Sequence, residues 1–121
     1  MNESAKNPWP YPAELDAMIA APEYHTVLFE NEHVRVLDAH VNPGETVPVH
    51  THCWPGVLYI LGVSDFVRRD PEGNVVLDTR SSASHAPAGA AVWGDVLTPH
   101  TLENVGEHQL RNITIELKHL T

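Results

Sequence analysis

The sequence is poor in cysteine and in basic residues. Its 121 residues contain a single cysteine, Cys53, so no disulfide can form within the chain, and a reducing cytosol suits it. Lysine and arginine number 7 against 16 aspartates and glutamates, which gives a formal charge of −9. Because nucleic-acid affinity comes largely from basic side chains that release counterions, this balance argues against nucleic acid as a partner.

Long apolar runs are also missing. No run approaches the roughly 20 residues that span a bilayer, and the first residues lack the basic and apolar regions of a signal peptide. We therefore expect a cytoplasmic protein with no membrane partner. The length suits a single compact unit, in which residues 1–22 form an arm and a short helix and residues 23–121 form a β-barrel domain.

Periodicity predicts one helix followed by many short strands. Residues 12–21 have apolar side chains at helical spacing, at Leu15, Met18 and Ile19. Turn signals such as Asn42-Pro43-Gly44 separate the later runs, which are rich in β-branched and aromatic residues. The expected strands are 24–29, 34–41, 46–52, 57–61, 64–69, 75–79, 90–93, 100–105 and 111–118. This pattern indicates an all-β sandwich or closed barrel.

Two of the nine histidines stand two residues apart, at His50 and His52. On a strand, such residues project from the same face, so their imidazoles can bind one cation. A third ligand has to come from another strand, and His100 opens a strand-like run. Three imidazoles with open coordination positions are typical of catalytic metal sites. From the residues alone, an exposed histidine pair that binds nothing is the alternative.

These histidines lie in two segments that resemble the motifs of the cupin superfamily. Gly44, His50 and His52 match the opening of the first motif, G-x5-H-x-H, and Gly89, His100 and Asn104 fall at the spacing of the second. The resemblance covers about residues 24–118. It implies a double-stranded β-helix, a jelly-roll barrel, with one metal ion held inside it by His50, His52 and His100.

The resemblance is incomplete at the motif glutamate. Gly56 or Val57 stands at its position, and Asp95 and Leu97 replace the proline and the glycine of the second motif. Cupins without this glutamate include thiol dioxygenases and a diketone-cleaving dioxygenase, which use iron on three histidines. The resemblance therefore implies one divalent metal, with iron favoured and zinc, nickel or manganese open, because imidazole suits several metals.

The expected activity follows from that metal site. The resemblance favours a dioxygenase acting on a small chelating or anionic metabolite. The alternatives are a non-redox isomerase, lyase or hydrolase, and a non-catalytic small-ligand-binding cupin, because one fold hosts many chemistries. Small cupins commonly pair, so we expect a homodimer to which the arm at residues 1–11 contributes.

Further residues are candidates for the pocket around the metal. Tyr59 and Trp93 adjoin the motif positions, and His40 and His85 are more distant candidates. We expect the remaining histidines, His25 among them, at the surface or in turns.

Adjacent on an expected strand, Arg68 and Arg69 should point to opposite faces. An inward arginine would suit a carboxylate, but the following turn favours solvated side chains at both positions. Glu103, Glu116 and Asp95 could orient a histidine or act as a general base, and the sequence does not choose among them. Cys53 should face away from the ligands.

Overall fold

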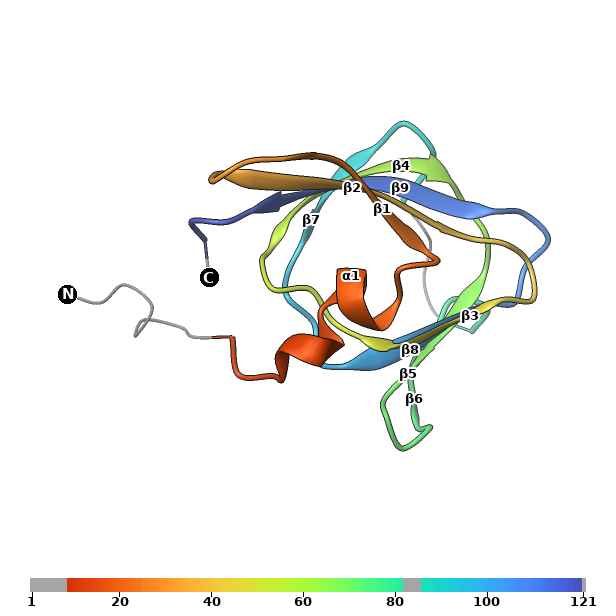
Figure 1. Cartoon of the computed structure of the whole chain (residues 1–121). Coiled ribbons are helices and arrows are strands. Elements are labelled where there is room, and N and C mark those ends of the chain that lie inside the picture. The colour runs from red at the N-terminus through yellow and green to blue at the C-terminus, as the bar shows by residue number, and fades with distance from the viewer. Residues whose placement is uncertain (1–8, 82–85, 121) are drawn as a thin grey trace.

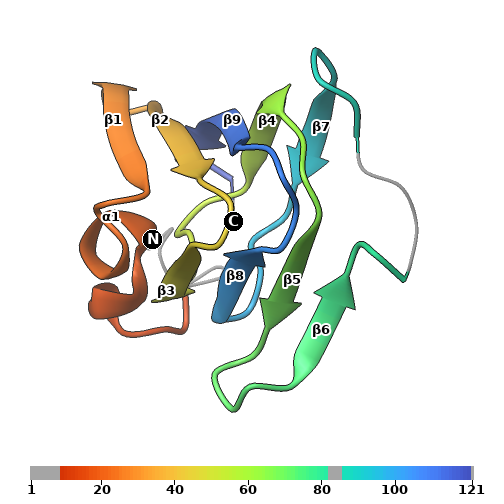
Figure 2. The same cartoon turned by 90° about the vertical axis from the view of Figure 1, so that its right-hand side faces the viewer.

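The computed structural model describes residues 9–81 and 86–120, which form two facing antiparallel sheets (Figure 1). The five-stranded sheet has the order β1-β2-β9-β4-β7, and the four-stranded sheet has the order β3-β8-β5-β6 (Figure 2). The strands are β1 (His25–Glu30), β2 (Val34–Val41), β3 (Thr46–His50), β4 (Gly56–Gly62), β5 (Phe66–Arg69), β6 (Val75–Asp78), β7 (Ala91–Gly94), β8 (His100–Asn104) and β9 (Leu110–Leu117). This arrangement confirms the predicted jelly-roll barrel, and each strand boundary lies within two residues of its expected position.

The expected helix at residues 12–21 is divided into two short pieces. A 3-10 turn, η2 (Ala13–Leu15), precedes α1 (Ala17–Ala20), and Asp16 between them is extended, with φ −61° and ψ 139°. The Asp16 carboxylate accepts a hydrogen bond from the backbone N–H of Met18, as an N-cap does. Within the described ranges no helix has the length and apolar character needed to cross a membrane.

The extended backbone at Asp16 joins the N-terminal segment to the end of β3. Asp16 and Thr51 form an isolated parallel bridge, in which the N–H of Ala17 donates to the Thr51 carbonyl at 2.9 Å and the N–H of Thr51 donates to the Leu15 carbonyl at 2.8 Å. In Figure 1, α1 lies at one end of the barrel between the two sheets, and it contacts both β1 and β3. The helix therefore covers the barrel end where β3 delivers His50 and His52.

Polar side chains are buried between the sheets at two places that position the site. Asn104, at the end of β8, donates to the carbonyls of Val41 and His108, both at 2.8 Å, and accepts from Ser64 at 2.9 Å. Arg35 of β2 lies opposite Glu116 of β9 in the ladder, and both are buried. Because losing one of these buried hydrogen bonds would leave its partner unsatisfied, the contacts fix the strands around the cavity.

Candidate metal centre

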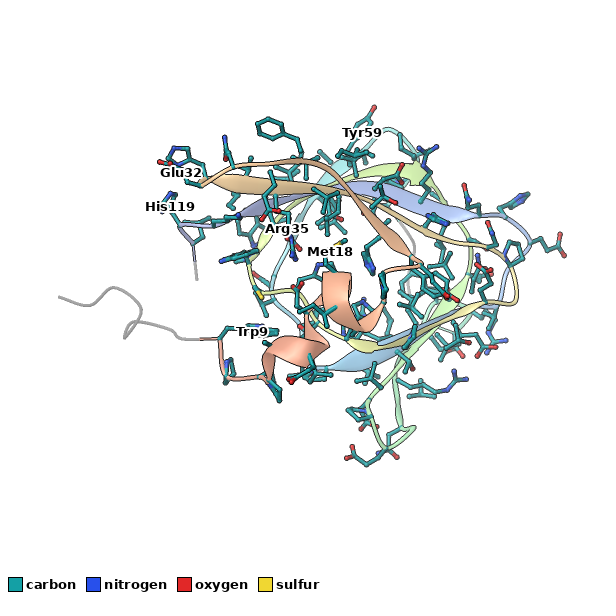
Figure 3. All side chains as sticks on the ribbon, in the orientation of Figure 1. Trp9, Met18, Glu32, Arg35, Tyr59 and His119 are labelled. Carbon is teal, nitrogen blue, oxygen red and sulfur yellow. The ribbon has the colours of Figure 1, made fainter. Side chains whose placement is uncertain are left out.

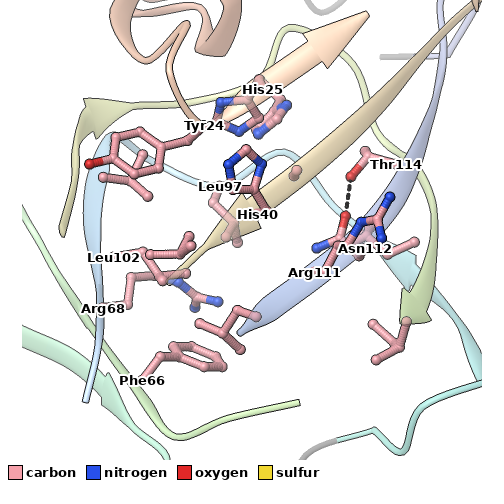
Figure 4. A pocket seen from close by; sticks show the side chains of 18 of the residues that line it. Tyr24, His25, His40, Phe66, Arg68, Leu97, Leu102, Arg111, Asn112 and Thr114 are labelled. Atoms are coloured by element: carbon pink, nitrogen blue, oxygen red, sulfur yellow. Dashed lines mark hydrogen bonds between the residues drawn. The ribbon is translucent and has the colours of Figure 1, made fainter. Parts of the chain in front are cut away.

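A cavity of about 610 Å³ lies between the two sheets (Figure 4). Most of its lining is apolar, and the exceptions include several histidines and two arginines. The histidines are His25, His40, His50, His52 and His100, and the arginines are Arg68 and Arg111.

Three of these histidines gather closely enough to share an ion. One ring nitrogen each from His25, His50 and His52 lies within 4.8 Å of those of the other two. Nitrogens that bind one ion at about 2.0–2.1 Å lie at most about 4.2 Å apart, so small ring movements suffice to close the group around a metal. His25 is 6% exposed, so the expectation that it lies at the surface or in a turn is wrong.

The third ligand predicted from the sequence, His100, adjoins this group. It is the ladder partner of His50 across β3 and β8, and the centroids of the two rings lie 4.7 Å apart. His100 does not belong to the group of three histidines whose ring nitrogens all lie within 4.8 Å of one another. The structure thus presents four neighbouring imidazoles, from β1, from the β3 segment and from β8.

Every one of the four rings has its Nδ1 atom hydrogen-bonded to an oxygen. In three rings the acceptor is a backbone carbonyl: His25 donates to Ala21 at 2.9 Å, His50 to Pro48 at 2.8 Å, and His100 to Thr98 at 2.7 Å. In the fourth ring, His52 donates to the Glu116 carboxylate at 2.5 Å. A carbonyl or carboxylate oxygen can only accept, so the proton resides on Nδ1. In a neutral imidazole that is protonated at Nδ1, the free lone pair is on Nε2, as in metal-ligating histidines.

A buried chain of charges extends from His52. Oε1 of Glu116 accepts from Nε of Arg35 at 2.5 Å, and the Arg35 guanidinium also pairs with both carboxylate oxygens of Asp16, at 2.8 and 3.0 Å. Figure 3 shows Arg35 between the sheets near α1. Although burial opposes its charge, Arg35 has a raised pKa because of the two carboxylates. The network holds the Glu116 side chain facing His52, so Glu116 orients that ring.

Burial keeps the other three imidazoles neutral. Loss of solvent lowers the pKa of His25 to about 4 and that of His100 to about 4. The pKa of His50 falls to about 3, from burial first and then from the neighbouring His100. Neutral imidazole is the form that binds metal, so these rings are ready to bind an ion at neutral pH without releasing a proton.

Comparison with known proteins identifies the fold. No protein family model matches this chain, and no curated protein matches it significantly. A cupin domain from Bordetella pertussis is similar, with 22% identity over 78% of this chain and 91% of that chain, and a TM-score of 0.63. The chain has the cupin fold. Two further proteins share this fold. A cupin with a double-stranded β-helix from Methanocaldococcus jannaschii is 16% identical over 78% of this chain and 79% of that chain, with a TM-score of 0.54. A polyketide cyclase from Streptomyces resistomycificus is 17% identical over 82% of this chain and 68% of that chain, with a TM-score of 0.52.

Backbone packing leaves no room for a side chain at Gly56. Gly56 stands at one of the two positions where the motif glutamate could fall, and a Cβ there would lie 1.9 Å from the Ile115 carbonyl oxygen of the neighbouring strand. Only glycine permits this close approach of two backbones, so neither a glutamate nor any other side chain fits there. His25, by contrast, brings an imidazole next to His50 and His52.

The pocket candidates are placed differently from one another. Trp93 lines the cavity mouth, and its Nε1 donates to Asp95 at 2.8 Å. Tyr59 lies on the outer face of the barrel instead (Figure 3), because its strand neighbours Leu58 and Ile60 face the cavity and side chains alternate. His40 lines the cavity, and His85 lies outside the described residues.

The two adjacent arginines do face opposite ways. Arg68 lines the cavity, whereas Arg69 points away from it and pairs with Glu103 at 2.8 Å. Sequence reasoning had favoured solvated positions for both, and for Arg68 this is wrong. Burial lowers the pKa of Arg68.

Cys53 is not a ligand. Its thiol donates to Asp16 Oδ1 at 3.4 Å, and burial followed by the Asp16 charge raises its pKa to about 12. The sulfur is therefore a neutral thiol at physiological pH, in agreement with the expectation that it faces away from the ligands.

Proposed function

We propose that this protein is a small metal-dependent cupin that acts on a small anionic or chelating metabolite as a dioxygenase. The observation that carries the proposal is the set of four neighbouring histidines, His25, His50 and His100 buried and His52 partly exposed, whose Nδ1 atoms are all hydrogen-bonded to oxygens. His50, His52 and His100 would hold one divalent metal, and His25 offers the fourth donor in place of the missing glutamate. An all-imidazole set suits iron, zinc, nickel and copper.

The histidines also set the charge of such a site. Neutral ligands leave an ion its full +2 charge, whereas a carboxylate ligand would reduce it, so an anionic substrate is favoured. When bound, iron would supply dioxygen activation and electron transfer, which a purely protein site cannot provide.

The residues of the chain supply position and environment. Glu116 holds the Nδ1 proton of His52 and so fixes the orientation of that ring. The apolar cavity wall excludes bulk water from a bound substrate and strengthens its electrostatic contacts with the site.

Elemental analysis and oxygen uptake test the proposal. We expect purified protein to retain close to one transition-metal ion per chain, and the iron-loaded form to consume oxygen with at least one member of a panel of thiols, diketones and hydroxy acids. The matched control is the double variant His50→Ala, His52→Ala, which should bind no metal. Absence of metal from the wild type after reconstitution would overturn the metal site, and metal binding without oxygen uptake would overturn the dioxygenase.

A non-redox reaction is the second candidate. The polyketide cyclase mentioned above has the same fold, which supports a metal-assisted isomerase, lyase or hydrolase on this scaffold. Zinc or nickel in place of iron in the protein as isolated, together with no oxygen uptake, would favour it.

We also propose a homodimer. β1 is an edge strand of the five-stranded sheet, and Leu28 and Phe29 on it are 54% and 55% exposed. Exposed apolar edges favour pairing with another chain. Light scattering during size-exclusion chromatography should give twice the monomer mass of 13.4 kDa, and the monomer mass would contradict it.

A further inference from the structure

Arg68 is unlike the other arginines of this acidic chain. Arg35, Arg69, Arg80 and Arg111 each pair with a carboxylate. Arg68 forms no hydrogen bond or ion pair with any residue in the described ranges, and its buried Nε lacks a partner there. Its guanidinium carbon lies 5.8 Å from the Phe66 ring centroid. A buried polar group without a partner costs free energy, so its retention needs an explanation.

The surroundings of Arg68 are apolar. Its ladder partners on the two neighbouring strands are Leu77 of β6 and Leu102 of β8, and both line the cavity beside it. In Figure 4 the guanidinium extends from β5 toward the middle of the cavity. Among the described lining residues the one carboxylate is Asp95, which already accepts from Trp93. The cavity therefore offers an unneutralised cation on an apolar wall.

Arg68 also lies close to the histidine cluster. His100 precedes Leu102 by two residues on β8, so it shares the cavity face and is a diagonal neighbour of Arg68. Diagonal neighbours on antiparallel strands are about 7–8 Å apart. Besides burial, the positive charge of Arg68 disfavours protonation of His100. A molecule of a few carbon atoms spans this interval.

We propose that Arg68 binds the carboxylate of a small organic acid, whose apolar body lies on Leu77, Leu102 and Phe66 and whose other end faces His100 and the rest of the histidine cluster. The planar guanidinium matches a carboxylate through two parallel N–H···O bonds. A single arginine balances a monoanion, whereas a phosphate dianion calls for more than one cation. The second lining arginine, Arg111, is already neutralised by Asp38 at 2.7 Å.

This inference names the substrate class of the proposed metal site, but the carboxylate contact itself needs no metal. Binding of benzoate and hexanoate, with benzamide and hexanamide as uncharged counterparts, can therefore be measured by NMR titration of both the metal-free and the metal-loaded full chain. We expect the acids to bind the wild type and the amides to bind at least about 10-fold more weakly. Arg68→Gln should weaken acid binding about 10- to 100-fold, the effect of losing a charged hydrogen-bonding partner.

Arg69→Gln is the matched control, since it removes the adjacent arginine from the outer face. It should leave acid binding unchanged. Equal binding of acids and amides, no effect of Arg68→Gln in a folded variant, or tighter binding of inorganic phosphate than of either acid would overturn the proposal. Metal content measured on the same samples keeps the two ideas apart. Arg68-dependent acid binding without metal would support this inference while the metal site fails, and metal binding without acid binding would do the reverse.

Discussion

Glu116 and His52 are joined by a 2.5 Å hydrogen bond between a fully buried carboxylate and a ring nitrogen of the histidine cluster. The same side chain accepts a hydrogen bond from Arg35 through its other oxygen, so it connects a structural ion pair to a ring of the histidine cluster. Stability of the barrel and geometry of the site therefore depend on a common group.

Glu116→Gln should weaken both properties. The amide loses the charge that Arg35 and His52 share, and breaking a buried ion pair typically costs about 3–5 kcal/mol. Removal of the partner that orients a ligand typically lowers metal affinity 10- to 100-fold. Urea unfolding and chelator competition measure the two effects. Glu103→Gln is the control, because its pair with Arg69 is partly exposed and such pairs contribute at most about 1 kcal/mol. Equal effects of the two variants would contradict the role given to Glu116.

Alanine substitutions of single histidines should identify the ligand set. We expect His25→Ala and His100→Ala each to weaken metal binding more than about 100-fold, since loss of an outer partner alone costs 10- to 100-fold. His40→Ala is the control, because His40 lines the same cavity but stands outside the three-histidine group. If His25→Ala retained full affinity while His100→Ala lost it, the ligands would be the three predicted from the sequence.

The metal-free protein should lose stability in mild acid. The pKa of His25, His50 and His100 lies at about 4, 3 and 4 in the folded chain, below the ordinary value of 6.5. The unfolded chain therefore binds protons first, so the stability present above about pH 6.5 is lost as the pH falls toward 4. Each histidine contributes up to about 1.4 kcal/mol per pH unit. Urea unfolding with a chelator from pH 8 to pH 4 measures the slope, which His50→Gln should reduce. A flat profile would refute the buried neutral state.

Cys53 should react slowly with thiol reagents in the folded protein. Its pKa of about 12 leaves roughly a thousandth of the thiolate that an ordinary thiol of pKa 9 supplies at pH 8. We expect the reaction with an aromatic disulfide to be at least 100-fold slower than after unfolding in urea. Asp16→Asn should accelerate it, because the Asp16 charge contributes to the shift. A native rate like the unfolded one would show that the thiol is not held by Asp16.

Arg68→Met should stabilise the ligand-free protein. Methionine keeps an apolar stem and removes a guanidinium that has no carboxylate partner in the described part of the chain. Replacement of an uncompensated charge in an apolar setting should raise the melting temperature by about 2–5 °C. Differential scanning calorimetry measures the change, and Arg69→Met should lower the melting temperature slightly or leave it unchanged. A lower melting temperature for Arg68→Met would mean that this side chain supports the fold instead of serving a ligand.

Local sequence patterns were sufficient to locate the strands, and the resemblance to cupins added the jelly-roll arrangement. Strand alternation and turn residues are short-range signals, so the nine strands of the described ranges could be located, and the spacing of His50 and His52 placed both rings in the cavity. Two adjacent arginines must face opposite ways, but a sequence does not fix which of them faces inward when a turn follows. Tyr59 was misplaced for the same reason, since the alternation phase of β4 depends on its pairing with β9.

His25 and the split helix could not be predicted, because both depend on long-range contacts. A lone histidine at the start of a strand carries no motif, and its proximity to His50 exists only once β1 and the β3 segment meet. Asp16 follows a helical pattern in the sequence. It becomes extended where its carboxylate pairs with Arg35 and its backbone bridges to Thr51, and neither partner is near it in the chain.

The bridge between Asp16 and Thr51 has a practical consequence for anyone shortening this protein. A truncation that begins at residue 23 would preserve every strand, yet it would delete the carboxylate that shares Arg35 with Glu116. Arg35 would then pair with Glu116 alone, and the hydrogen bond from His52 to Glu116 would weaken. Asp16, which precedes the first strand, thus supports the histidine cluster through a chain of three contacts that ends at His52.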